Sequence, residues 1–209
     1  ERLAASESFS LDDEQRQAII SKLNIPQSRP VVLYAAQSMD HKTPIHHMMP
    51  AVRQSGSVLL VKFHPRMADD VNEWRRWANE QGYTSEEIVF CRDELTSFDP
   101  LRLCDVCVTV FSTVAIEAMI LGKPVVYVQY LAGTFALDYA SRYGAGIDAE
   151  NPKDLQAAIE DLVHNETLRR EIVDKGYVAA KDDLAGLDGK SLIRSVDEIT
   201  ALVARRQAG

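Results

Sequence analysis

Short runs of consecutive apolar residues alternate along this chain with longer segments in which apolar residues recur every three to four positions. A short apolar run bounded by turn residues is typical of a strand buried on both faces, whereas the longer spacing is typical of an amphipathic helix. The pattern predicts strands at residues 31–35, 57–63, 87–91, 106–111 and 124–128.

Helices are predicted between these strands and after the last of them. They cover residues 11–23, 44–54, 68–81, 101–104, 152–164, 166–175 and 188–206, with a helical turn near 137–142. Asn151 followed by Pro152 is a helix-start signal, and Gly176 is expected to stop the helix that precedes it. Strands that alternate with helices in this way predict an α/β fold. We expect a Rossmann-like, doubly wound parallel sheet with helices on both faces and a helical C-terminus.

The composition narrows the class of protein. The 209 residues are 46% hydrophobic, which is enough for one sizeable core. A net charge of −8 argues against a nucleic-acid partner. No apolar run reaches the roughly 18 residues of a transmembrane helix, and no signal peptide opens the chain. Because the chain starts at Glu1 without Met, we expect it to be a fragment of a longer protein.

The cysteines and the clustered histidines are expected to be structural. Cys104 and Cys107 form a CxxC, but two residues three apart on one strand point to opposite faces, a poor geometry for a metal or a redox pair. We therefore expect buried, unreactive thiols in a reducing, cytoplasmic compartment. His41, His46 and His47 have no carboxylate or cysteine at metal-ligand spacing, so we expect no metal site.

The segment from Cys104 to Val128 carries the strongest functional signal. It predicts a buried strand, a Ser112-Thr113 turn, a helix that holds Glu117, and a second strand. A helix N-terminus at the carboxyl end of a strand favours an anion such as a phosphate. Glu117 lies one turn below Thr113, about 6 Å along the axis, where the ribose of a nucleotide would lie. A carboxylate among the apolar side chains of this helix also requires an explanation.

Two further polar segments follow predicted strands, and ligands of such folds bind at the carboxyl ends of the strands. Gln37 and Ser38 follow the first strand; His64, Pro65 and Arg66 follow the second. The His64 imidazole could donate to a phosphate oxygen or protonate a leaving phosphate. The plainer alternatives stay open: His64 as a solvated turn residue, Arg66 as a surface cation, and Ser112 or Thr113 as an ordinary helix cap.

These motifs resemble a known family. The block D-V-C-V-T-V-F-S-T-V-A-I-E-A-M-I-L-G-K-P-V-V resembles the donor-binding signature in the C-terminal domain of GT-B glycosyltransferases. K-F-H-P-R followed by F-S-T resembles the paired His-Pro and Ser-Ser/Ser-Thr motifs of bacterial capsule sialyltransferases and Kdo transferases. The same pair occurs in the CDP-glycerol glycerophosphotransferase (teichoic acid polymerase) group.

The resemblance implies roles for particular residues. His64 and Ser112-Thr113 would hold the donor phosphates, with His64 catalytic, and Glu117 would hold the ribose. Arg66, Gln37 and Ser38 would complete the nucleotide site, and Asp138 and Tyr139 would contact the donor group, although residues 129–138 depart from the teichoic-type pattern. No cofactor and no metal are expected, since the substrate itself is an activated donor of the CMP, CDP or UDP type.

The resemblance also implies how the chain is organised. Residues 1–30 would form a linker with the leading helix, 31–187 the Rossmann-like donor domain, and 188–209 a helix packing on that domain or toward a missing N-terminal half. That half would bind the acceptor, so the chain alone is expected to be inactive. The whole enzyme would build a bacterial surface or capsular polysaccharide in the cytoplasm. It could associate peripherally with the inner face of the membrane through the rest of the protein.

Two other functions stay open. A non-hydrolysing UDP-sugar 2-epimerase would share the fold and the Ser/Glu helix, with further catalytic carboxylates in the missing half. A nucleotide-binding module without catalysis is the second, and His64 argues against it.

Overall fold

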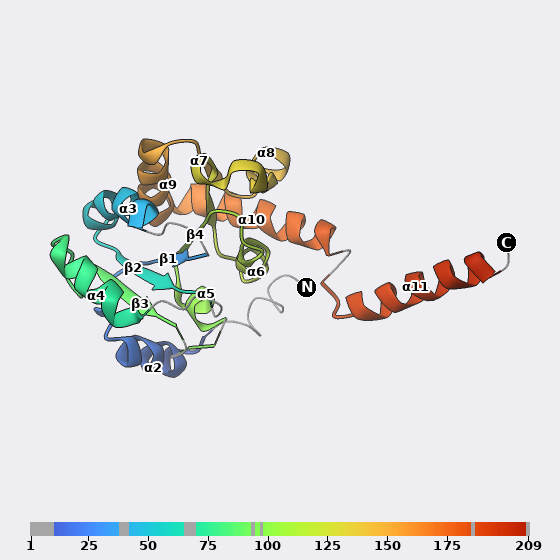
Figure 1. Ribbon diagram of the computed structural model, residues 1–209, viewed down its shortest axis with the longest axis horizontal. Coiled ribbons are helices and arrows are strands. Elements are labelled where there is room, and N and C mark those ends of the chain that lie inside the picture. The colour runs from blue at the N-terminus through green and yellow to red at the C-terminus, as the bar shows by residue number, and fades with distance from the viewer. Residues whose placement is uncertain are drawn as a thin grey trace.

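A six-stranded parallel sheet forms the centre of the computed structural model (Figure 1), which describes residues 11–37, 42–64, 70–92, 95–96, 98–184 and 187–207. Its order within these residues is β3-β2-β1-β4-β5-β6. The strands are β1 (Val31–Ala35), β2 (Val58–Lys62), β3 (Ile88–Cys91), β4 (Val106–Thr109), β5 (Val125–Val128) and β6 (Ile147–Ala149). All neighbouring strands pair in parallel. The order reverses between β1 and β4, and this switch point is where ligands of such sheets bind.

Five strands agree with the sequence prediction and β6 was missed. Only three residues long and carrying Asp148, β6 has no apolar run. It pairs with β5 through Val126 and Ile147. Gly146 precedes it with φ +131°, and a Cβ there would collide with the Tyr127 ring. Tertiary pairing, and not local apolar pattern, therefore makes this strand.

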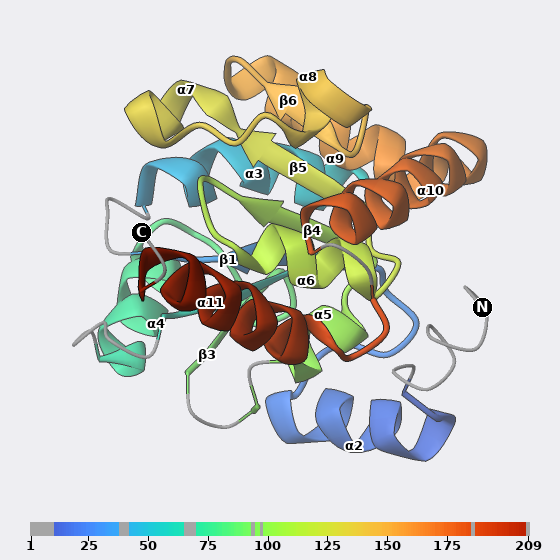
Figure 2. The ribbon, with the colours of Figure 1, turned by 90° about the vertical axis from the view of Figure 1, so that its right-hand side faces the viewer.

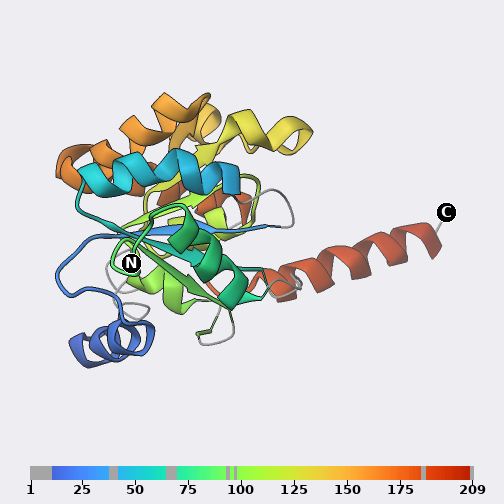
Figure 3. The ribbon, with the colours of Figure 1, turned by 60° about the vertical axis from the view of Figure 1, so that its left-hand side comes forward.

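Helices cover both faces of the sheet (Figures 2 and 3). Those that pack on one face are α3 (Lys42–Gln54), α4 (Val71–Glu80) and α9 (Pro152–His164). Those on the other are α2 (Asp13–Leu23), α5 (Asp99–Leu103), α6 (Val114–Ile120) and α8 (Tyr139–Tyr143), together with the C-terminal part of α10 (Glu166–Asp183). Between β5 and α8 lie α7 (Gln129–Ala132) and the 3-10 turn η1 (Gly133–Phe135). Two buried apolar layers result, which confirms the doubly wound fold.

The α10 helix corrects one prediction. Gly176 was expected to stop it, yet α10 continues to Asp183 and Gly176 is buried within it. The glycine lies where α10 packs on α6, and a Cβ there would come 3.0 Å from Cγ of Met119. The absent side chain allows the two helices to approach closely.

The last helix, α11 (Ser191–Gln207), extends away from the sheet and its helices (Figure 1). Six apolar side chains on it are 50–76% exposed: Leu192, Ile193, Val196, Ile199, Leu202 and Val203. The division of the chain at residues 30 and 187 stays a prediction. In the part of the chain that the structure describes, no helix combines the length and apolarity that crossing a membrane requires.

Candidate functional site at the switch point

The loops that follow β1 and β4 are joined by a side chain. Gln37 lies two residues beyond β1, and its Oε1 accepts a hydrogen bond from the Phe111 backbone N–H at 3.1 Å. Gln37 therefore holds the β4 loop in place at the switch point, which is a structural role that the sequence did not indicate. The predicted contact of Gln37 with a donor stays a prediction, and Ser38 lies outside the described residues.

Ser112 and Thr113 begin α6 as predicted. The Ser112 Oγ accepts from the Val114 N–H at 3.3 Å, and the Ser112 N–H donates to Thr109 Oγ1 at 3.4 Å. Thr113 is exposed and its hydroxyl makes no capping bond. The Ser112 hydroxyl therefore serves the start of α6, whereas Thr113 is exposed and makes no such bond.

Glu117 lies on α6, half-buried, one turn beyond Thr113. Burial raises the pKa of its carboxyl above the ordinary value. Within the described residues it forms no salt bridge, and α6 carries no other carboxylate. A carboxyl held in this way can bind a hydroxyl group of a ligand without first breaking an ion pair.

His64 is exposed and follows β2 by two residues. The strand is fixed up to that point, since Ala36 N–H donates to Lys62 O at 3.0 Å and Phe63 N–H to Cys91 O at 3.1 Å. His64 thus leaves the sheet at the same edge as Gln37 and Ser112. Arg66, like Pro65, lies outside the described residues.

Asp138 and Tyr139 have different surroundings from those expected. Tyr139 is 8% exposed; its ring stacks between Tyr127 and Tyr143, and its hydroxyl donates to Asp183 of α10. Burial is the main cause that raises the pKa of Tyr139. Its side chain therefore packs in the core in this structure, and only Asp138 is exposed. Donor contact by either residue stays a prediction.

Gln129 was missed by the sequence reasoning. It follows β5 directly, and its Nε2 donates to Leu137 O and to Asp148 Oδ1, each at 2.7 Å. Its Oε1 is buried without a hydrogen-bond partner in the described part of the chain. A polar residue directly after an apolar strand was the available signal, as it was for Gln37.

The three cysteines are buried free thiols. The geometric argument about the CxxC was wrong, because Cys104 ends α5 and precedes β4. Cys104 and Cys107 consequently share one apolar layer. Burial raises the pKa of Cys104 to about 12 and that of Cys107 well above its ordinary value, which suppresses thiolate chemistry.

The histidines of α3 are held by tyrosines. His46 Nδ1 lies at hydrogen-bond distance from the Tyr83 hydroxyl, and His47 Nδ1 lies 2.8 Å from the Tyr130 hydroxyl. Among the residues described, no three His, Cys, Asp or Glu side chains gather closely enough to hold a metal ion.

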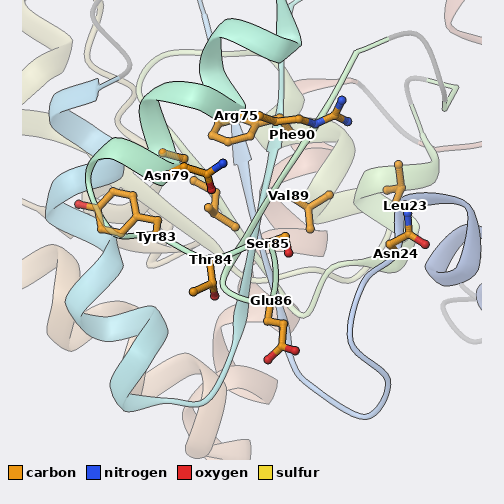
Figure 4. Close-up of a pocket in the computed structure, with 12 residues that line it drawn as sticks. Leu23, Asn24, Arg75, Asn79, Tyr83, Thr84, Ser85, Glu86, Val89 and Phe90 are labelled. Carbon is orange, nitrogen blue, oxygen red and sulfur yellow. The ribbon is translucent and has the colours of Figure 1, made fainter.

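A hollow of about 590 Å³ lies elsewhere, along the edge strand β3 (Figure 4). Leu23 and Asn24 line one side and Arg75 and Asn79 of α4 the other, with Val89 between them. None of the predicted site residues contributes to it.

A parallel sheet of order 3-2-1-4-5-6 with polar side chains at its switch point defines a Rossmann-like domain, a class of fold in which ligands bind at that point. The family model described as CDP-Glycerol:Poly(glycerophosphate) glycerophosphotransferase matches residues 8–171, and the chain belongs to this family. The resemblance seen in the His-Pro and Ser-Thr motifs is confirmed.

Solved structures show the same fold. HepE of Anabaena, in complex with UDP and glucose, is 15% identical with a TM-score of 0.66, over 94% of this chain and 54% of HepE. A glycosyltransferase from Rickettsia africae is 13% identical with a TM-score of 0.71, over 94% and 53%. The wall teichoic acid polymerase TagF, soaked with CDPG, is 17% identical with a TM-score of 0.61, over 94% and 47%. No curated protein sequence matches the chain. The chain spans about half the length of these structures.

Proposed function

We propose that this chain is the donor-binding half of a transferase that moves a sugar or polyol from a nucleotide-activated donor to an acceptor hydroxyl. The observation that carries the proposal is the arrangement of Thr113 and Glu117 on α6, at the edge where His64 leaves the sheet, in a member of this family. The bound UDP of HepE and the CDPG of TagF support a nucleotide diphosphate as the donor.

The proposed chemistry is displacement at the carbon or phosphorus attached to the donor nucleotide. The acceptor oxygen forms the new bond and gives up its proton to a base in the acceptor-binding half, and the bond to the nucleotide phosphate breaks, leaving its electron pair on that phosphate. The Thr113 hydroxyl and the first N–H groups of α6 stabilise the developing negative charge, and His64 donates a hydrogen bond or a proton to the leaving phosphate. Glu117 accepts from the ribose hydroxyls. These groups supply the charge stabilisation without a metal ion.

The rest of the proposal concerns the whole protein. An acceptor-binding half outside this chain completes the cleft, and α11 packs toward it. The product is a bacterial surface or capsular polysaccharide, assembled in the cytoplasm at the inner face of the membrane.

Calorimetric titration with CMP, CDP, UDP and GDP tests the donor site. We expect at least one of them to bind, and His64→Ala and Thr113→Ala to weaken that binding by about tenfold or more with an unchanged circular dichroism spectrum. His164→Ala, at the exposed end of α9, is the matched control and should bind as the unmutated chain does. A folded chain that binds none of the four nucleotides would overturn the proposal.

A further inference from the structure

Two phenylalanines stand beside the proposed phosphate site. Phe111 directly precedes Ser112, and Phe135 ends the η1 turn after β5. Their ring centroids are 5.3 Å apart at an interplanar angle of 37°. Residues 111 and 135 are far apart in the sequence, so the sequence pattern alone did not connect them.

The two rings differ in how they are held. Phe111 is half-buried and packs against the core, and its backbone N–H donates to Gln37. Phe135 is 68% exposed, and its ring packs against the ring of Phe111. A single exposed apolar side chain is ordinary on a protein surface. The Phe135 ring, however, packs against the Phe111 ring, which is held at the switch point. The two rings together form an apolar platform.

The order of the groups along the donor decides which of them lies at this platform. This placement rests on the proposed function. Glu117 lies one turn into α6 and Ser112-Thr113 at its start, so the ribose and the phosphates occupy successive positions toward the N-terminal end of α6. The transferred group is joined to the phosphates on the side opposite the ribose. Phe111 directly precedes Ser112 and so lies next to this end of α6, and Phe135 lies against Phe111 across the ring contact.

We infer that Phe111 and Phe135 form a platform for the carbon skeleton of the transferred group. The chemistry recognised is the C–H face of a polyhydroxylated skeleton, whose carbons pack on the rings while its hydroxyls project to the side. Phenylalanine has no polar atom with which to compete for those hydroxyls. A sugar ring and an open polyol chain both present such a face, and the test separates them.

The test compares each donor with its own nucleoside diphosphate by calorimetry: UDP-glucose against UDP, and CDP-glycerol against CDP. In Phe135→Ala we expect the donor that binds to lose roughly three- to tenfold in affinity, the range of one aromatic contact, with the matching nucleoside diphosphate unchanged. Phe135→Tyr should retain the affinity. Phe98→Ala removes another exposed phenylalanine, next to α5, and should change nothing. A loss of affinity for UDP-glucose assigns the platform to a sugar ring, and a loss of affinity for CDP-glycerol assigns it to a polyol.

Two results would overturn the inference while leaving the proposed function intact. One is an equal loss of affinity for the donor and for its nucleoside diphosphate in Phe135→Ala, which places Phe135 at the nucleotide. The other is unchanged donor binding in Phe135→Ala, which leaves the exposed ring to a protein partner. If the unmutated chain binds no nucleotide, the proposed function fails, and the platform fails with it.

Discussion

Glu117 shows how one side chain combines a cost in stability with a proposed function. Its carboxyl is half-buried on an otherwise apolar helix, and burial raises its pKa from the ordinary 4.5. A raised pKa means that the folded protein holds this proton more tightly than the unfolded chain does. The folded state is therefore favoured by this group below pH 4.5, and that contribution is lost as the pH rises through the raised pKa.

Glu117→Gln should consequently be more stable than the unmutated chain at pH 7, because it removes a charge that burial disfavours. The difference should shrink as the pH falls toward 4. Urea unfolding between pH 4 and pH 7 measures it, with Glu198→Gln on the exposed face of α11 as the control. The same variant should bind nucleotide more weakly. A variant less stable at pH 7 would contradict the assignment of the raised pKa to burial.

Gly146 is a residue whose role depends on its neighbours. It has φ +131°, and a Cβ would collide with the Tyr127 ring and come 2.7 Å from Val125 O. Gly146→Ala should therefore destabilise the protein by more than about 2 kcal/mol. Gly82→Ala is the matched control: φ is +73° and nothing lies within 4 Å, so only the backbone cost of about 1 kcal/mol is expected. Urea unfolding measures the free energy of unfolding of both variants. Equal losses in the two would show that backbone strain alone acts at Gly146.

At the scale of elements, the position of α6 depends on α10. The predicted stop at Gly176 was a sound inference from local propensity, since an isolated glycine in a helical pattern often marks its end. In the fold the glycine is needed instead for the close approach to Met119. The helix that carries the proposed site is thus positioned by the contact of Met119 with Gly176, which lie 57 positions apart in the sequence.

Gly176→Val should separate the two helices and lower the free energy of unfolding by roughly 1–3 kcal/mol through overpacking. Met119→Ala makes room for the new side chain, so the double variant should be more stable than the sum of the two single effects predicts. A double-mutant cycle from urea unfolding measures this coupling. Strict additivity would contradict direct contact between the two positions.

At the scale of the molecule, the chain corresponds to about half of each structural neighbour. The exposed apolar side chains of α11 fit the proposed acceptor-binding half outside the chain. In the proposed mechanism, the charge on the leaving phosphate is stabilised by α6 and His64 alone.

Nucleotide affinity should accordingly be the same, within about a factor of two, before and after treatment with EDTA. Calorimetry in the presence and absence of added Mg²⁺ measures it. A tenfold loss of affinity on chelation that Mg²⁺ restores would contradict the metal-independent site.

Incubation of the chain with donor and acceptor should give no transfer product, because in the proposed function the acceptor-binding half lies outside the chain. Turnover by the chain alone would contradict this.

Much of the fold could be predicted, because apolar periodicity and helix-start signals are local. The Asn151 cap lies where the sequence indicates it, and five of the six strands in the described residues agree within two residues at each end. What failed depended on distant contacts: β6, which requires β5; Gly176, which requires Met119; and the core position of Tyr139, which requires α10.

By itself the sequence determined the class of fold and the residues with which chemistry can be done. Alternating apolar runs and helical periods dictate a parallel sheet, and polar residues after its strands must emerge at one edge. Only the tertiary structure decided which strands are neighbours. Pairing β1 with β4 is what brings Gln37 to Phe111, and the path after β5 brings Phe135 to the same edge. Such contacts arise from the packing of whole elements, and no local pattern encodes them.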